Sequence, residues 1–547
     1  MLNPHALAQS EGIKMSNLAS REVEGTSSSK HRDEADLARL GKRSVLKRSF
    51  GFLAVLGFST TILITWEGLF TTFLQPLQNG GPAGAVYGYI FVWAGTAAIF
   101  AMLSEMVSMA PTSGGQYHWC SMLASPRAMK FSSYVTGWLT VVGWQATFAT
   151  ACYLTGTMIQ GLIALTNTSY VFHAWHSTLL YWSVVAFGLV INTVGGATLL
   201  PKFEGLILVL HIVGFFAVLI PLVYMSDHSS AKDVFATWVN DGGWETQGVS
   251  FFVGLIGVVF AFAGGDAAVH MAEETRNAPK IVPISLMFSV ALNGVLGFAM
   301  LLASLFCLGD LELDLESPTG YPFMAIFLQG TGSVAGATTM AAIVVVMALC
   351  ATTGMLATSS RMFWAFARDR GVPGWRLWSQ ISPRAGVPVN AVIFTATVST
   401  LLGLIPLGSP VAFNDLTSMS TSGLYLSYMV CCILLLYRRL TGGIIDPSET
   451  SNDGMSPADY EQKVNTAGAK LVWGPFHVKG IFGVAINVFA IVYLLITVFF
   501  SFWPPAAEVT VSTMNYSAVG TVGTMALSLL YYFVRARHVY EGPIVEI

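Results

Sequence analysis

Two carboxylates lie inside long apolar runs of this sequence. Glu67 falls in the run 51–77, and Asp266 falls in the run 249–272. A charge in the hydrocarbon core of a membrane costs about 2.5–3.5 kcal/mol on insertion scales, so chains that keep one turn it toward a partner, water or a substrate. Glycines adjoin both carboxylates and weaken the helices there. A carboxylate beside a weak point of a membrane span is typical of a transport site.

The composition requires a membrane. The chain has 547 residues, of which 54% are hydrophobic and 10% are charged, whereas a soluble domain carries about 25% charged residues. Each span needs about 20 apolar residues. We therefore predict an all-α polytopic membrane protein. Its expected spans number about twelve and lie near 50–77, 84–108, 131–165, 179–199, 203–225, 249–272, 282–308, 333–362, 388–407, 413–437, 480–503 and 516–534.

The two weak points recur at corresponding places in the chain. They are about 200 residues apart, as the first helices of two five-helix halves would be. Interrupted helices in corresponding positions indicate an inverted-repeat transporter. Unwound backbone leaves N–H and C=O groups free to meet a substrate, and half-helix N-termini favour anionic groups. The alternative is that the glycines serve packing and that neighbouring helices satisfy each acid.

Charge predicts the topology. All 27 Lys and Arg except Lys232 fall in the N-terminal tail, the even-numbered connections or the C-terminal tail. The positive-inside rule places these segments, and both termini, in the cytoplasm. The sequons at Asn167 and Asn515 then fall in outer loops, where we expect glycosylation.

The expected domain plan follows this topology. The first 47 residues are polar and carry no evident signal peptide, so we expect a disordered cytoplasmic tail. The remaining parts are a ten-helix core at 48–437 with halves at 48–226 and 247–437, a cytoplasmic connection at 438–479, two further helices at 480–535 and a C-terminal tail at 536–547.

Other chemistries find little support. The six cysteines have no metal-ligand spacing, so we expect packing roles, no metal and no cofactor. Gly264-Gly265-Asp266 resembles the Gly-x-Gly-Asp of intramembrane proteases, but Ala263 breaks the motif and no Tyr-Asp partner appears. A phosphate loop for an ATP-driven pump and a repeated channel filter are also missing from the sequence. We therefore expect a protein that is not an enzyme.

Several longer motifs resemble a known group. They are Asn79-Gly80-Gly81-Pro82, Gly114-Gly115-Gln116-Tyr117-His118-Trp119, Gly143-Trp144-Gln145, Glu273-Glu274-Thr275-Arg276 and Trp364-Ala365-Phe366-Ala367-Arg368-Asp369. With them, residues 50–535 resemble the amino acid–polyamine–organocation superfamily, and more narrowly the fungal amino acid/choline transporter (choline/GABA permease-like) group.

The resemblance implies a leucine-transporter-type fold, a 5+5 inverted repeat plus two helices, and alternating-access transport that is usually driven by protons. Counting back from Gly80 places Trp66-Glu67-Gly68 on the substrate loop of helix 1, where relatives carry Gly-Ser-Gly. The resemblance also implies that Phe260 is an aromatic gate in helix 6. His211 stands where many relatives have a proton-coupling lysine. A histidine titrates near neutral pH and suits that role; a neutral histidine bonded to backbone is the alternative.

The expected site binds a cationic head group. A carboxylate with aromatic faces recognises quaternary ammonium ions, and each aromatic contact contributes about 0.5–2 kcal/mol; filler facing lipid or core is the alternative role for these aromatics. A zwitterion remains open, with its amine at Glu67. The expected substrate-binding residues are Thr65, Trp66, Glu67, Gly68, Trp144, Phe260, Ala261, Phe262, Ala263, Gly264 and Gly265.

We expect structural or gating roles for Asp266 and for four further acidic residues. Asp266 is expected to cap the second half of helix 6 at the break. The others lie toward the cytoplasmic ends of their helices, so we expect gating or fold contacts with the basic loops: Glu105, Glu204, Glu273 and Glu274.

The sequence therefore predicts a secondary transporter, a proton symporter that imports a small amine or amino acid across the plasma membrane. Choline, GABA, polyamines and other amino acids are open as substrates. The expected partners are the lipid bilayer and this small molecule, with no nucleic acid, and the proton gradient supplies the energy. The alternatives are a nutrient sensor with the same fold, and an exporter or organelle permease.

Overall fold

The computed structural model describes residues 33–309, 315, 317–407, 412–446, 463–511 and 514–546, and its regular structure there is helical apart from isolated bridges. Within these ranges, eleven helices are long and apolar enough to cross a membrane, and α11 (Gln247–Ala261) is a shorter apolar helix. This confirms the predicted all-α polytopic fold. The long elements are α2 (Phe52–Leu63) with α3 (Thr65–Thr72), α5 (Gly81–Met109), α7 (Met129–Thr166), α8 (Ala174–Val194), α9 (Gly196–Met225), α13 (Ala278–Phe306), α16 (Val334–Arg368), α18 (Val389–Leu402), α19 (Ala412–Leu440), α21 (Gly480–Ser501) and α22 (Ser517–Val534).

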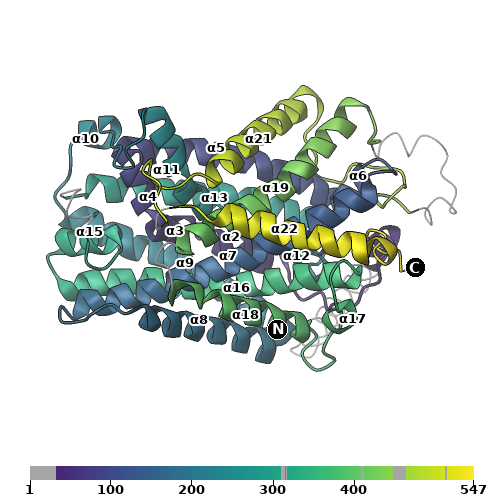
Figure 1. The fold of residues 1–547 in the computed structure, drawn as a ribbon, viewed down its shortest axis with the longest axis horizontal. Coiled ribbons are helices and arrows are strands. Elements are labelled where there is room, and N and C mark those ends of the chain that lie inside the picture. The colour runs from purple at the N-terminus through teal and green to yellow at the C-terminus, as the bar shows by residue number, and fades with distance from the viewer. Residues whose placement is uncertain are drawn as a thin grey trace, which may run out of the picture.

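Short helices join the long ones. They are α4 (Leu74–Gln78), α6 (Gln116–Leu123), α10 (Ala231–Ala236), α12 (Ala267–His270), η1 (Ala272–Glu274), α15 (Pro322–Thr331), α17 (Trp375–Trp378), η2 (Ile405–Leu407) and η4 (Ala536–His538). Figure 1 shows α10 and α15 at one end of the molecule and α6 and α17 at the other.

The first ten spans pack as two matched sets of five. The contact of α2 with α13 has its counterpart in α11 with α5, and α2 with α9 corresponds to α11 with α19. In the same way α7–α8 corresponds to α16–α18, and α7–α19 to α16–α9. Because each set has an odd number of crossings, the second set enters the membrane from the side opposite to the first. The packing is therefore that of an inverted repeat.

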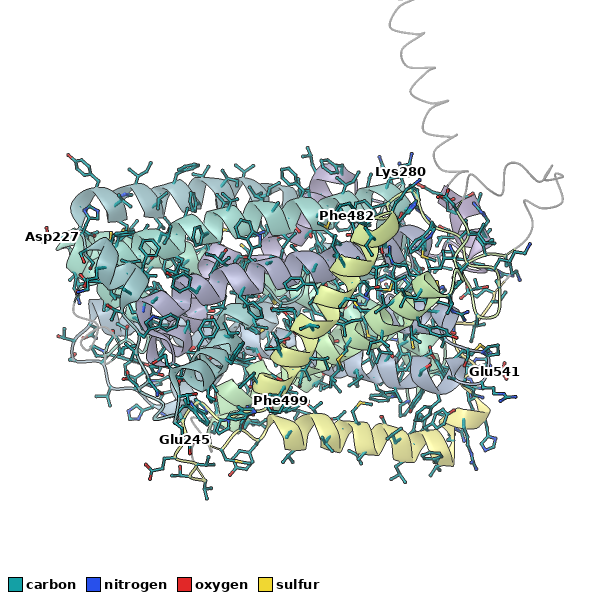
Figure 2. The ribbon with its side chains drawn as sticks, turned by 90° about the horizontal axis from the view of Figure 1, so that it is seen from above. Asp227, Glu245, Lys280, Phe482, Phe499 and Glu541 are labelled. Carbon is teal, nitrogen blue, oxygen red and sulfur yellow. The ribbon has the colours of Figure 1, made fainter. Side chains whose placement is uncertain are left out.

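Both described ends of the chain meet at one end of the bundle, called the terminal face below. The Arg43 backbone N–H donates to Glu546 Oε2 at 2.8 Å, and the Glu546 N–H donates to the Gly41 carbonyl at 2.7 Å. An even number of spans places both ends on the same side of the membrane, as this contact requires. Figure 2 shows the labelled Lys280 and Glu541 at this end of the apolar bundle and Asp227 and Glu245 at the opposite end.

The expected disorder of residues 1–47 is wrong for their described part. Residues 33–39 are helical, and the side chains of Leu37 and Leu40 are buried. The neighbouring Lys42 also reaches a buried carboxylate, Asp369, at 2.6 Å, so both apolar burial and an ion pair hold this segment against the bundle. Residues 1–32 and, in the connection predicted at 438–479, residues 447–462 lie outside the described residues.

Candidate functional site

The first span breaks at Ile64. This residue separates α2 from α3 and has φ +31° and ψ +47°, a left-handed conformation that a β-branched side chain rarely adopts. Asn293 of α13 bridges the break, because its Oδ1 accepts from the Thr65 N–H at 3.2 Å and its Nδ2 donates to the Thr60 carbonyl at 3.1 Å. The resemblance placed the loop at Trp66–Gly68, one turn too late: those residues form the first turns of α3.

The second break matches its prediction. Helix α11 ends at Ala261, a turn covers 262–266, and α12 follows. Gly264 has φ +86°, a conformation that glycine adopts without strain. A Cβ at Gly265 would lie 1.6 Å from Phe100 Cζ, so only glycine allows this close approach.

Asp266 does not cap α12 through its side chain, contrary to expectation. Its carboxylate instead lies within hydrogen-bond distance of four side chains from four helices. Tyr428 donates to Oδ1 at 2.6 Å, and Oδ2 lies 2.5 Å from Gln116 Nε2, 3.2 Å from Trp144 Nε1 and 3.2 Å from His270 Nε2. His270 Nδ1 faces the Ser113 carbonyl at 2.9 Å. His270 thus links the Asp266 carboxylate to the backbone at Ser113.

A cavity lies between the two breaks. No charged side chain lines it among the described residues. Four predicted residues line it: Gly68, Phe260, Ala261 and Ala263. Sequence reasoning missed the other wall residues, which come from α2, the break at Ile64, α3, α7 and α16: Ile62, Leu63, Ile64, Thr71, Thr147, Ala151, Leu154, Thr155, Ala348, Ala351 and Met355.

Seven predicted residues are buried nearby without lining this cavity: Thr65, Trp66, Glu67, Trp144, Phe262, Gly264 and Gly265. Trp144 is held by Asp266, and the Phe262 ring packs against Tyr89 with centroids 5.2 Å apart. Helical geometry explains the positions of the four that lie in helices, Thr65, Trp66, Glu67 and Trp144, because a helix whose one face lines a cavity must turn its other faces toward neighbouring helices.

Glu67 turns toward α9, where it meets His211. The Nδ1 atom of His211 lies 2.7 Å from Glu67 Oε1, and both side chains are fully buried. Glu67 Oε2 and His211 Nε2 have no hydrogen-bond partner among the described residues. The Trp66 ring packs against His211 and against Phe215, at centroid distances of 5.9 and 6.1 Å. The structure thus joins the predicted substrate carboxylate to the predicted proton-coupling histidine, and rules out a backbone partner for His211 Nδ1.

Three of the four other acids make the expected contacts with basic residues. Arg368 clamps Glu273 through two nitrogens at 2.8 and 2.7 Å, and Arg361 Nε lies 3.0 Å from Glu274. Glu105 pairs with Arg439. Glu204 is the exception, since it accepts a hydrogen bond from the Thr61 hydroxyl at 2.7 Å.

The two sequons differ in exposure. Asn167 is exposed and follows α7. Asn515 is buried, and its Nδ2 donates to Ser418 Oγ, the Ser501 carbonyl and the Trp503 carbonyl at 3.0–3.2 Å. Its predicted glycosylation is therefore wrong for this structure, because a sugar needs that nitrogen free.

Comparisons with known proteins agree with this architecture. The family model described as amino acid permease matches residues 50–524. A choline transporter of Saccharomyces cerevisiae is 31% identical over 499 residues, which cover 91% of this chain and 83% of that protein. Amino-acid permease BAT1 of Arabidopsis thaliana is 29% identical over 93% of this chain and 96% of its own length. Amino-acid permease 2 of Neurospora crassa is 27% identical, with 98% and 93% covered.

These relatives are named as transporters and not as enzymes. A membrane-spanning inverted repeat, two facing helix breaks and a buried cavity between them are the parts such a protein needs. The family match spans most of the chain and includes both breaks. The chain belongs to the amino acid permease family of membrane transporters.

Proposed function

We propose that this permease imports a small amine with a cationic head group, choline-like or GABA-like, in symport with a proton. The contact between Glu67 and His211 carries the proposal. It joins a carboxylate and an imidazole beside a helix break, at the depth of the cavity. No charged side chain lines that cavity among the described residues. A relative named as a choline transporter supports the substrate class.

The pair can hold and release one proton. An ionised Glu67 accepts a hydrogen bond from His211 Nδ1–H in both the neutral and the charged imidazole. The two forms differ only by a proton on Nε2, and this atom has no hydrogen-bond partner among the described residues. Protonation at Nε2 makes the pair neutral overall. A neutral pair costs less to keep inside the membrane, so the protonated transporter changes between its conformations more easily.

The cation would be attracted to the same carboxylate. Gly68, the neighbour of Glu67, lines the cavity, and Glu67 Oε2 has no hydrogen-bond partner among the described residues. The apolar wall and the Phe260 ring suit the methyl or methylene groups that surround an ammonium charge. We propose further that the terminal face is cytoplasmic and the membrane is the plasma membrane, since the Lys and Arg distribution favours that orientation.

Radiolabelled uptake in a transport-deficient yeast tests the proposal. Labelled choline should accumulate and should be competed by unlabelled choline more strongly than by GABA or basic amino acids. A protonophore should abolish accumulation above equilibrium. Uptake that does not change with a pH gradient imposed at constant membrane potential would refute the proton coupling. Uptake of GABA without uptake of choline would show that the substrate is a zwitterion.

A further inference from the structure

Glu204 of α9 is a buried carboxylate that the proposed function does not use. Its Oε2 accepts from the Thr61 hydroxyl of α2 at 2.7 Å, and its Oε1 has no hydrogen-bond partner among the described residues. Oε1 points at α16, because a Cβ built on Gly354 would lie 3.3 Å from it. Helices α2 and α16 both line the cavity through neighbouring residues, so Glu204 lies directly behind the cavity wall.

The surroundings of Glu204 supply no countercharge. Helix α2 presents the Thr61 hydroxyl and the backbone at Gly57, and α16 presents Gly354 and the thiol of Cys350. On α9 itself, Lys202 is exposed. No Lys, Arg or His lies within ion-pair distance of Glu204 among the described residues. An ionised carboxylate buried in this way takes up a proton instead of keeping its charge.

The position of Glu204 on α9 relates it to the site above. Residues seven apart lie on the same face of a helix and about 10 Å apart along its axis. Glu204 and His211 have this spacing, and both face the broken first span. Glu204 contacts α2, the half before the break, whereas His211 contacts α3, the half after it. One face of α9 thus presents a titratable group to each half of the span.

We propose that Glu204 is a second protonation site of the transport cycle, on the terminal side of the break. Its carboxyl group holds a proton while α2 packs against α9 and α16. When this half of the span moves and water from the terminal face reaches Glu204, the group ionises and the proton passes to water. The proposal rests on the proposed proton coupling, and it adds the residue that returns the proton on the far side of the break.

Infrared spectroscopy tests the protonation without a substrate. Wild-type protein in lipid nanodiscs at neutral pH should show a carbonyl-stretch band of a protonated carboxyl group that is lost in Glu204→Gln. The matched control is Glu245→Gln, which replaces an exposed carboxylate and should leave the band intact. Thr61→Val removes the hydrogen bond to Oε2 and should shift the frequency of the band. If the band is still present in Glu204→Gln, or if its frequency is unchanged in Thr61→Val, the proposal is refuted.

Transport of labelled choline in proteoliposomes tests the role in the cycle. Glu204→Gln should keep choline exchange under equilibrium conditions, because glutamine imitates the protonated acid. It should lose accumulation driven by a pH gradient, about tenfold per pH unit for each coupled proton. Accumulation equal to the wild type would overturn the proposal. Failure of the wild type itself to respond to the gradient would refute the proposed function, while the infrared band would still decide the state of Glu204.

Discussion

Asn293 and Thr65 hold the first helix break in place across two spans. The side-chain Oδ1 of Asn293 accepts from the Thr65 N–H, a group that loses its helical acceptor at the break, while Nδ2 binds the Thr60 carbonyl. Freed backbone groups inside a membrane need such partners. The same contact must also offset the left-handed backbone of Ile64, a strain of order 1–3 kcal/mol. Helix α13 therefore determines where the first span opens.

Replacing Asn293 should weaken the break. Asn293→Ala leaves the Thr65 N–H unpaired and removes one of the two donors to the Thr60 carbonyl, which keeps the Ile64 N–H at 3.2 Å. The free energy of unfolding should therefore fall by about 1–3 kcal/mol. Asn293→Asp keeps the acceptor and loses the donor, so its stability should fall between alanine and wild type. Thermal unfolding in detergent measures this order. Equal stability of the alanine variant and the wild type would show that the contact does not hold the break.

The location of this break explains what sequence could and could not predict. Apolar runs and glycines located both interrupted spans, because hydropathy and helix propensity are local properties. The first break was predicted one turn late, since Gly68 is a weak helix residue whereas Ile64 carries no local signal for a left-handed backbone. Its cause is Asn293, which lies 228 residues away from Thr65 in the sequence.

The partners of the buried acids were hidden for the same reason. Glu67 and His211 were each selected alone, but 144 residues separate them and no local pattern joins them. Asp266 was expected to cap its own helix, yet three of its four side-chain partners come from α6, α7 and α19. Side-chain partners across a bundle depend on helix rotation, which the hydropathy of one span does not fix.

Glu67→Gln should abolish uptake at low substrate concentration while the protein still reaches the membrane. The amide keeps the size of the side chain and an acceptor for His211, but it removes the charge that attracts the substrate cation. A charge-assisted hydrogen bond contributes about 1.5–3 kcal/mol, so the apparent affinity should fall about 10–100-fold. Labelled choline uptake, normalised to the protein in the membrane, measures the effect. Normal uptake would remove Glu67 from substrate binding.

His211→Gln should separate uptake from the pH gradient. Glutamine can donate to Glu67 as the imidazole does, but it cannot gain a proton. Facilitated uptake down a concentration gradient should persist, whereas accumulation should no longer change when the external pH is lowered at constant membrane potential. His211→Ala serves as the comparison, because it also leaves Glu67 without its partner and should lose stability. An unchanged pH dependence in His211→Gln would exclude this residue from coupling.

Lys42 and Asp369 should close the terminal face through a buried ion pair. Burial acts to raise the pKa of Asp369, but Lys42 and Arg368 outweigh it and hold the pKa below its usual range. The stability from a lowered carboxyl pKa is present above the unfolded value, near 3.9, and is lost as the pH falls through the folded value. The pair is therefore fully formed at neutral pH.

Lys42→Met should destabilise the protein by about 3–5 kcal/mol at neutral pH, because it leaves a buried carboxylate short of its partner. Lys479→Met is the matched control: that lysine is 74% exposed and 3.5 Å from Asp446, so its loss should change the stability by about 0–1 kcal/mol. Thermal unfolding from pH 7 downward measures both. The difference between wild type and Lys42→Met should shrink only in strongly acidic buffer, where Asp369 is protonated in both proteins. A difference that already disappears near neutral pH, or equal losses in the two lysine variants, would show that the pair does not stabilise the closed terminal face.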